Sequence, residues 1–285
     1  MLLAAIVSKP QKPELSTILP ELIDWLARHE YDSVLDPDSA GYVGGVGGVT
    51  RVDLPLYHPN LVIVLGGDGT LLSAGRAFAR TGTPILSVNL GALGFLTEIP
   101  LSDLYGTLEA WCGGTAVIDQ REMMHAELWR GKDLLQAWDA LNDVVIAKGT
   151  IARMADFRVE IDSQLVAKFR ADGIIVATPT GSTAYNLAAN GPIVMPSISA
   201  TVVTPICPHL LTLRPIVVPS VSTVCVHVVG VPNETYLTVD GQEAVAVHLG
   251  DHVECRRSEY SVKLLRHQPN GLFNVLRSKL KWGER

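Results

Sequence analysis

The sequence has little positive charge and few cysteines. Its 285 residues include 23 lysines and arginines against 29 aspartates and glutamates, which gives a formal net charge of −6 at pH 7. Nucleic-acid-binding proteins usually carry a basic stripe, so nucleic acid is not expected as a partner. The four cysteines lie far apart without a C-x-x-C pair. This spacing predicts neither a zinc site nor a redox motif and favours reduced thiols in a cytoplasmic protein.

Long uninterrupted apolar segments are also missing. Residues 201–232 hold a single charge, Arg214, but four prolines interrupt every stretch of about 20 residues that could form a membrane helix. The apolar N-terminus carries no basic region, which predicts a first strand rather than a signal peptide. We therefore expect no membrane partner. Walker A and G-x-S-x-G motifs are absent, which argues against P-loop proteins and α/β-hydrolases.

The most informative stretch is residues 61–72. Five apolar residues, 61–65, predict a buried parallel strand, and the glycine turn G-G-D-G-T follows at 66–70. Glycines let backbone N–H groups approach an anion, and a helix starting near the end of the turn adds further unpaired N–H groups. The stretch therefore predicts a phosphate-binding loop, whose residues are Gly66, Gly67, Gly69 and Thr70.

Asp68 is the unusual residue of this loop, because a bare phosphate would repel its carboxylate. We expect it to face a hydroxyl that loses its proton, or a metal ion carried by the phosphates. The alternative is that Asp68 only caps the helix and the glycines only form a turn.

The pattern of apolar residues changes near residue 119. With 47% hydrophobic residues, the chain can build two modest cores. Strands and helices alternate up to residue 118, which predicts an α/β domain with a Rossmann-like parallel sheet. Short alternating or β-branched runs follow over 119–267 and predict a β-rich, antiparallel, sandwich-like domain. Residues 268–285 are expected to return to the first domain.

A second polar motif interrupts the β-rich region. Residues 170–186 read R-A-D-G-I-I-V-A-T-P-T-G-S-T-A-Y-N and predict a strand, a hydroxyl-rich glycine turn and a helix. The hydroxyls of Thr178, Thr180, Ser182 and Thr183 could donate to phosphate or sugar oxygens, and Tyr185 offers a flat face for an aromatic ring. Taken alone, the motif also fits an ordinary helix N-cap.

The two motifs together resemble the NAD kinase family. The G-G-D-G-T loop is shared with lipid kinases and, more loosely, with 6-phosphofructokinases. The T-P-T-G-S-T-A-Y segment at 178–185 and N-D-V-V at 142–145 are similar to NAD kinases alone, as is D-G-Q-E at 240–243. The resemblance implies transfer of the ATP γ-phosphoryl group to the 2′-hydroxyl of the adenosine ribose of NAD, in a cleft between the two domains.

The resemblance also assigns residues. Asp68 would accept the proton, Mg²⁺ would arrive bound to ATP, and no side chain of the protein is expected to be a metal ligand. The family is homo-oligomeric, which implies a homodimer or homotetramer. The expected NAD contacts are Asp68, Gly69, Asn142, Asp143, Arg153, Arg170, Asp172, Thr183, Ala184, Tyr185, Asn186, Leu187, Ala188 and Gln242.

Two alternatives stay open at this point. A lipid or sugar kinase would use the same glycine loop with another acceptor. A non-catalytic nucleotide sensor would keep the fold but use Asp68 only as a helix cap.

Overall fold

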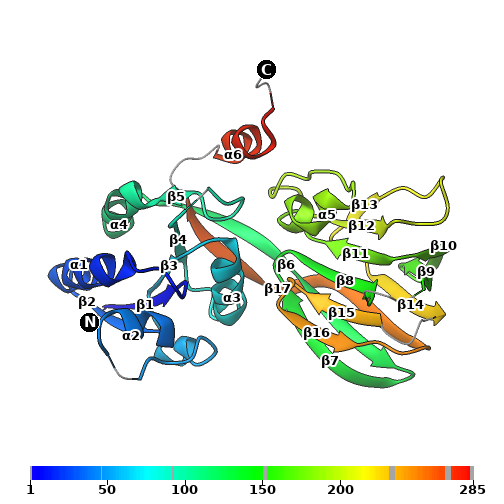
Figure 1. Cartoon of the computed structure of the whole chain (residues 1–285), viewed down its shortest axis with the longest axis horizontal. Coiled ribbons are helices and arrows are strands. Elements are labelled where there is room, and N and C mark those ends of the chain that lie inside the picture. The colour runs from blue at the N-terminus through cyan, green and yellow to red at the C-terminus, as the bar shows by residue number, and fades with distance from the viewer. Residues whose placement is uncertain are drawn as a thin grey trace. The chain divides into compact units, whose positions relative to one another are not determined.

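The computed structural model of the chain describes residues 2–45, 47–91, 93–149, 153–230, 235–266 and 271–282. The chain divides into two compact units, shown in Figure 1: unit 1 is Met1–Gln120 with Val262–Arg285, and unit 2 is Arg121–Ser261. Strands β6 (Val117–Arg130) and β17 (Asp251–Arg266) each contain residues of both units. The predicted functional domains, 1–118 with 268–285 and 119–267, stay a prediction, and residues 267–270 and 283–285 lie outside the described part.

Unit 1 is built on a parallel sheet, as predicted. The strand order is β2 (Tyr31–Leu35), β1 (Leu2–Ser8), β3 (Leu61–Leu65) and β4 (Ile85–Asn89), with β5 (Ile99–Pro100) and the end of β17 both paired in parallel with β4. All five residues of β3 are fully buried. The apolar run at 61–65 therefore has the burial expected for a strand covered on both faces.

Helices cover this sheet. One core cluster joins alternate residues of β1 and β3 to helices α1 (Leu15–Arg28) and α4 (Leu104–Cys112). Helix α3 (Asp68–Phe78) contacts β1 and β3 from the other side (Figure 1). The remaining helical segments of unit 1 are α2 (Pro37–Tyr42), α6 (Gly271–Leu280) and the 3₁₀ turns η1 (Leu54–Tyr57) and η2 (Leu101–Asp103).

Unit 2 is a sandwich of two sheets. The pairs β9–β10, β9–β14, β14–β17 and β6–β7 are antiparallel, and so are all neighbouring pairs of the second sheet. The first sheet holds β10 (Gln164–Ala171), β9 (Ala155–Ile161), β14 (Val224–Gly230), β17, β6 and β7 (Asp133–Ala140). The second holds β13 (Ile216–Pro219), β12 (Ala200–Ile206), β11 (Gly173–Ala177), β8 (Asp143–Lys148), β15 (Thr235–Val239) and β16 (Glu243–Ala246).

The core of unit 2 lies between these sheets. Alternate residues of β14, Val224, Val226 and Val228, join one apolar cluster with Ile146 of β8 and Ile174 of β11. The alternation that predicted half-buried strands is the period-two pattern of side chains in a sheet. The predicted fold class, an α/β first domain and an antiparallel β-rich second domain, is confirmed.

The predicted helix after the hydroxyl-rich turn is much shorter than expected. Only the 3₁₀ turn η3 (Gly181–Thr183) and one turn of helix, α5 (Tyr185–Ala188), form there. Among the described residues, no helix combines the length and apolarity needed to cross a membrane.

Candidate active site

In unit 1 the site begins where β3 ends. The glycine turn follows β3 directly, and α3 starts at Asp68, two residues earlier than predicted. Gly66 and Thr70 are buried, whereas Gly69 is exposed. A Cβ on Gly66 would lie 2.6 Å from Oγ1 of Thr70, so the turn requires a residue without a side chain there. The loop therefore presents Gly67 at the N-terminus of α3, where the helix end favours an anion.

The carboxylate of Asp68 holds a neighbouring turn. Oδ1 accepts hydrogen bonds from the backbone N–H groups of Leu96 (3.2 Å) and Thr97 (3.0 Å) and from the Thr97 hydroxyl (2.9 Å). Oδ2 accepts one, from the N–H of Phe95 at 2.9 Å. Gly94 packs directly against this carboxylate, and a side chain there would clash with it, because a Cβ would lie 2.0 Å from Oδ1.

The alternative that Asp68 is only a helix cap is wrong. The N-cap residue of α3 is Gly67, and no side-chain cap hydrogen bond forms. Asp68 occupies the first turn and directs its carboxylate to residues 95–97 instead. Oδ2 therefore accepts a single hydrogen bond from the described residues, and this oxygen can accept a further one.

In unit 2 three turns meet around Asn142 and Asp143. The carboxylate of Asp240 accepts from the backbone N–H groups of Leu141 (3.0 Å), Asn142 (2.7 Å) and Asp143 (3.2 Å). The N–H of Asp240 donates to the carbonyl of Asp143 at 3.0 Å, and the N–H of Thr178 donates to the carbonyl of Asn142 at 2.9 Å. The segments 142–145, 178–185 and 240–243 are thus brought together by backbone hydrogen bonds.

Burial changes the acidity of Asp143. The residue is 5% exposed, and desolvation together with the nearby carboxylate of Asp240 raises the pKa of Asp143 to about 7. A hydrogen bond from the backbone N–H of Tyr185 opposes this shift. Asp143 therefore changes charge near neutral pH, which is common for groups in functional sites.

Most hydroxyls of the second motif build the turn rather than point outward. The Thr178 hydroxyl donates to the carbonyl of Leu141 at 2.6 Å, and the Ser182 hydroxyl donates to that of Pro179 at 2.6 Å. Thr180 accepts from the buried guanidinium of Arg121 at 3.1 Å. The expectation that Thr178, Thr180 and Ser182 donate to a ligand is wrong, because all three are buried.

The surface of this turn is formed by the residues that follow. Tyr185 and Ala188 are exposed, as is Gln242, while Thr183, Ala184 and Leu187 are partly exposed. Asn186 is fully buried: its amide donates to the carbonyls of Ser182 and Pro192 and accepts from Thr204. Its side chain therefore supports the turn, and the accessible ring of Tyr185 is the group available for stacking on an aromatic base.

The single strand predicted at the start of residues 170–186 is interrupted, so Arg170 and Asp172 do not share a strand face. Strand β10 ends at Ala171 and the chain bends at Asp172 before β11 begins. Arg170 pairs with Asp156 at 2.6 Å and lines a surface hollow of about 450 Å³, whereas Asp172 pairs with Lys148 at 2.9 Å. Arg153 is exposed and precedes β9, and no contact recorded for the described residues links it to these groups.

Three supporting residues were missed from the sequence. Thr97 binds Asp68, Asp240 holds the 141–143 backbone, and Arg121 lies under the hydroxyl-rich turn. A signal existed for Thr97, because polar residues after neighbouring parallel strands meet at one sheet edge. No local sequence pattern identifies Arg121, because an arginine that becomes buried cannot be distinguished in the sequence from an ordinary exposed arginine of a strand.

Comparison with known proteins identifies the family. Models described as the ATP-NAD kinase N-terminal and C-terminal domains match residues 58–116 and 141–267. The chain is 59% identical over 281 residues to an NAD kinase of Acidobacterium capsulatum, covering 99% of both chains. The chain belongs to the NAD kinase family. An NAD kinase of Koribacter versatilis is 51% identical, covering 99% of this chain and 98% of the relative.

Solved NAD kinase and NADH kinase structures share the fold. A yeast NADH kinase complexed with NADH superposes with a TM-score of 0.89 at 25% identity, covering 100% of this chain and 89% of the other. An Archaeoglobus fulgidus NAD kinase in complex with ATP gives a TM-score of 0.77 at 24% identity, covering 98% and 99%. The two family models cover both the Asp68 loop and the Asn142, Thr178 and Asp240 turns of this chain.

Proposed function

We propose that this protein transfers the γ-phosphoryl group of ATP to the 2′-hydroxyl of the adenosine ribose of NAD, giving NADP, with Asp68 as the proton acceptor. Family membership carries the reaction: the chain phosphorylates NAD to NADP. The proposal for Asp68 rests on its carboxylate, which lies at the N-terminus of a helix beside a glycine loop. Its Oδ2 accepts one hydrogen bond from the described residues and can accept another. Such a carboxylate can orient a hydroxyl and take its proton.

The glycine loop supports the donor side of the reaction. Phosphoryl transfer depends mainly on positioning and charge neutralisation. The backbone N–H group of Gly67 and the positive end of the α3 dipole suit phosphate oxygens. Mg²⁺ enters as part of the Mg-ATP substrate and neutralises charge on the transferred group.

The Asn142 turn supports the acceptor side. Oδ1 of Asn142 is buried and accepts no hydrogen bond from the described residues. An unmatched buried acceptor costs about 1–3 kcal/mol, so a donor from the substrate would relieve it. We assign the NAD contacts to this turn, to Tyr185 and to the predicted residues around them.

A homodimer or homotetramer in the cytoplasm completes the proposal. All four cysteines are free thiols, which suits a reducing compartment. Light scattering coupled to size exclusion measures the number of subunits directly.

One experiment tests the reaction and its acceptor position. The protein is incubated with Mg-ATP and NAD, and phosphorus NMR assigns the new phosphate. We expect the phosphate on the adenosine 2′-hydroxyl. Turnover of diacylglycerol or fructose 6-phosphate without turnover of NAD would favour another kinase of the superfamily, and binding of both nucleotides without product would favour a sensor.

A further inference from the structure

The outer face of the first sheet of unit 2 carries a cluster of metal-ligating side chains. On β14, Val224, Val226 and Val228 face the core, so Cys225 and His227 between them face outward. On β17 the same alternation turns His252 and Glu254 to this face. Neither the glycine loop nor the Asn142 turn contains any of these residues, and the proposed phosphoryl transfer uses none of them.

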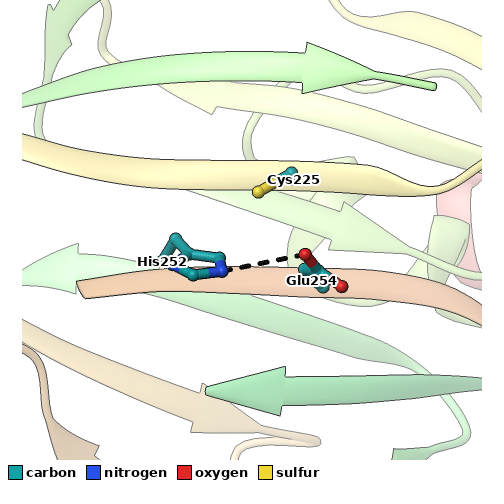
Figure 2. Close-up of side chains that lie close together, drawn as sticks. All are labelled: Cys225, His252 and Glu254. Atoms are coloured by element: carbon teal, nitrogen blue, oxygen red, sulfur yellow. Dashed lines mark ion pairs between the residues drawn. The ribbon is translucent and has the colours of Figure 1, made fainter. Parts of the chain in front are cut away.

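Strand register brings three potential ligands together. Cys225 of β14 is paired directly with Glu254 of β17, and His227 is paired with His252. Figure 2 shows Cys225, His252 and Glu254 on the same side of the two strands, with a dashed line from the His252 ring to Glu254. One ligand atom from each of the three residues lies within 4.8 Å of the others.

These separations suit a small tetrahedral ion. Zn²⁺ takes sulfur at about 2.3 Å and nitrogen or oxygen at about 2.0–2.2 Å, which places neighbouring ligand atoms roughly 3.5 Å apart. The distance from Nε2 of His252 to Oε1 of Glu254 is already 3.7 Å. Bringing the sulfur into range takes a shift of roughly 1 Å, which small side-chain torsions supply.

Neighbouring side chains hold the cluster in place. The His252 ring stacks between Trp129 at 6.3 Å and His227 at 5.3 Å, measured between ring centroids. Nε2 of His227 lies 3.3 Å from the Cys225 sulfur and 3.1 Å from Glu160. Glu160 also forms an ion pair with Arg158. Because His227 and Glu160 already interact with each other, we leave them out of the ligand set, which consists of three residues.

We propose that Cys225, His252 and Glu254 form a binding site for Zn²⁺ that the proposed catalytic reaction does not use. The set supplies one thiolate, one imidazole nitrogen and one carboxylate oxygen, a combination that favours a borderline-soft ion over Mg²⁺ or Ca²⁺. Binding would release the proton of the Cys225 thiol to solvent, and the negative charges of the resulting thiolate and of the Glu254 carboxylate would balance the two positive charges of the ion. A water molecule would take the fourth position.

The site links two neighbouring strands from outside the core. Because its ligands come from the folded register of β14 and β17, Zn²⁺ binds the native state and stabilises it by mass action. All three ligands lie in unit 2. The expected effect is therefore a higher melting temperature of this unit with added Zn²⁺.

Titration of the metal-free full-length protein with Co²⁺ tests the site. Co²⁺ replaces Zn²⁺ in such sites and reports a thiolate ligand by a sulfur-to-metal charge-transfer absorption. We expect this absorption to saturate at one Co²⁺ per chain and to disappear when Zn²⁺ is added. Absence of the absorption in the wild-type protein would overturn the proposal.

Matched variants assign the ligands. Cys225→Ser should lose the absorption, whereas Cys207→Ser, which removes an exposed thiol elsewhere, should keep it. His252→Gln and Glu254→Gln should weaken Co²⁺ binding by about 100-fold or more, because loss of even an outer partner costs about 10–100-fold. An unchanged spectrum in Cys225→Ser, or unchanged affinity in both other variants, would show that the ion binds elsewhere. If Cys225→Ser fails to fold by circular dichroism, the two Gln variants decide.

Discussion

At the scale of single residues, Asp68 combines a structural contact with the proposed chemistry. Its carboxylate accepts four hydrogen bonds from residues 95–97. Asp68→Asn removes the charge and the proton acceptor, and general-base assistance is worth ~10²–10⁴ in rate. We expect kcat to fall by about that factor. The asparagine NH₂ group must also face an N–H or hydroxyl donor, with which it cannot form a hydrogen bond. Thermal unfolding should therefore show a free energy of unfolding lower by about 1–3 kcal/mol.

Thr97→Val separates these two roles. It removes a donor to Asp68 and keeps the carboxylate, so it should cost similar stability while kcat stays within several-fold of the wild type. Equal losses of kcat in Thr97→Val and Asp68→Asn would mean that Asp68 acts only by holding the 94–97 turn.

Asp143 predicts a pH dependence of stability. The pKa of Asp143 is raised to about 7 in the folded protein, whereas in the unfolded chain the carboxyl ionises near its ordinary pKa of 3.8. Ionisation is therefore easier in the unfolded state, and stability is lost as pH rises from about 4 to about 7. Asp143→Asn should remove this loss. Denaturant titrations measure the free energy of unfolding of both proteins. The value for the variant minus that for the wild type should be larger at pH 8 than at pH 5.

A pH-independent difference between these proteins would show that Asp143 stays ionised. Asp162→Asn, an exposed change in unit 2, controls for the general loss of one negative charge.

Arg170 predicts an effect on substrate binding. Its side chain is 67% exposed and is oriented by Asp156. A charge-assisted contact to NAD is worth about 1.5–3 kcal/mol, so Arg170→Ala should raise KM for NAD by about 10-fold or more with kcat little changed. Asp156→Ala keeps the guanidinium and serves as the matched variant. A collapse of kcat at constant KM would remove Arg170 from the binding site.

At the scale of elements, the strand–loop–helix of unit 1 offers a test within one turn. A Cβ on Gly66 would meet Thr70 at 2.6 Å, whereas a Cβ on Gly67 meets nothing within 4 Å. Gly66→Ala should therefore destabilise the protein by about 1–3 kcal/mol, as overpacking does. Gly67→Ala should fold normally and raise KM for ATP if the loop amides contact phosphate. Thermal melts and initial rates measure both, and equal melting temperatures would contradict the close packing at Gly66.

At the scale of the whole molecule, the chain returns to unit 1 through the end of β17. Arg266 pairs there with Glu98 and with Asp119, whose Oδ2 lies 2.7 Å from Nε, and its side chain is only 11% exposed. Removing one partner of a buried pair costs about 3–5 kcal/mol, because the other charge stays buried. Arg266→Met should therefore destabilise unit 1.

Hydrogen exchange locates this effect. Amides of β3 and β4 should exchange faster in Arg266→Met, with those of β8 and β11 unchanged. Arg257→Met removes an ion pair with Glu122 from a side chain that is 50% exposed, and should cost at most about 1 kcal/mol. Equal loss of protection in both units would show that they unfold as one.

Much of the fold and the outline of the site followed from the sequence alone. The apolar run at 61–65 and the alternation after residue 119 report burial directly, because the side-chain period of a strand determines which residues face a core. The G-G-D-G-T and T-P-T-G-S-T-A-Y segments identified the family because their residues are contiguous.

Only the tertiary structure decided which groups meet. It directed Asp68 to Thr97 instead of the helix end, buried Thr178 and Ser182 inside the turn, and separated Arg170 from Asp172 by a bend. The cysteine spacing predicted no zinc site, whereas strand pairing places Cys225 opposite Glu254. These contacts join residues far apart in the chain, and their hydrogen bonds and register depend on long-range packing that no local pattern encodes.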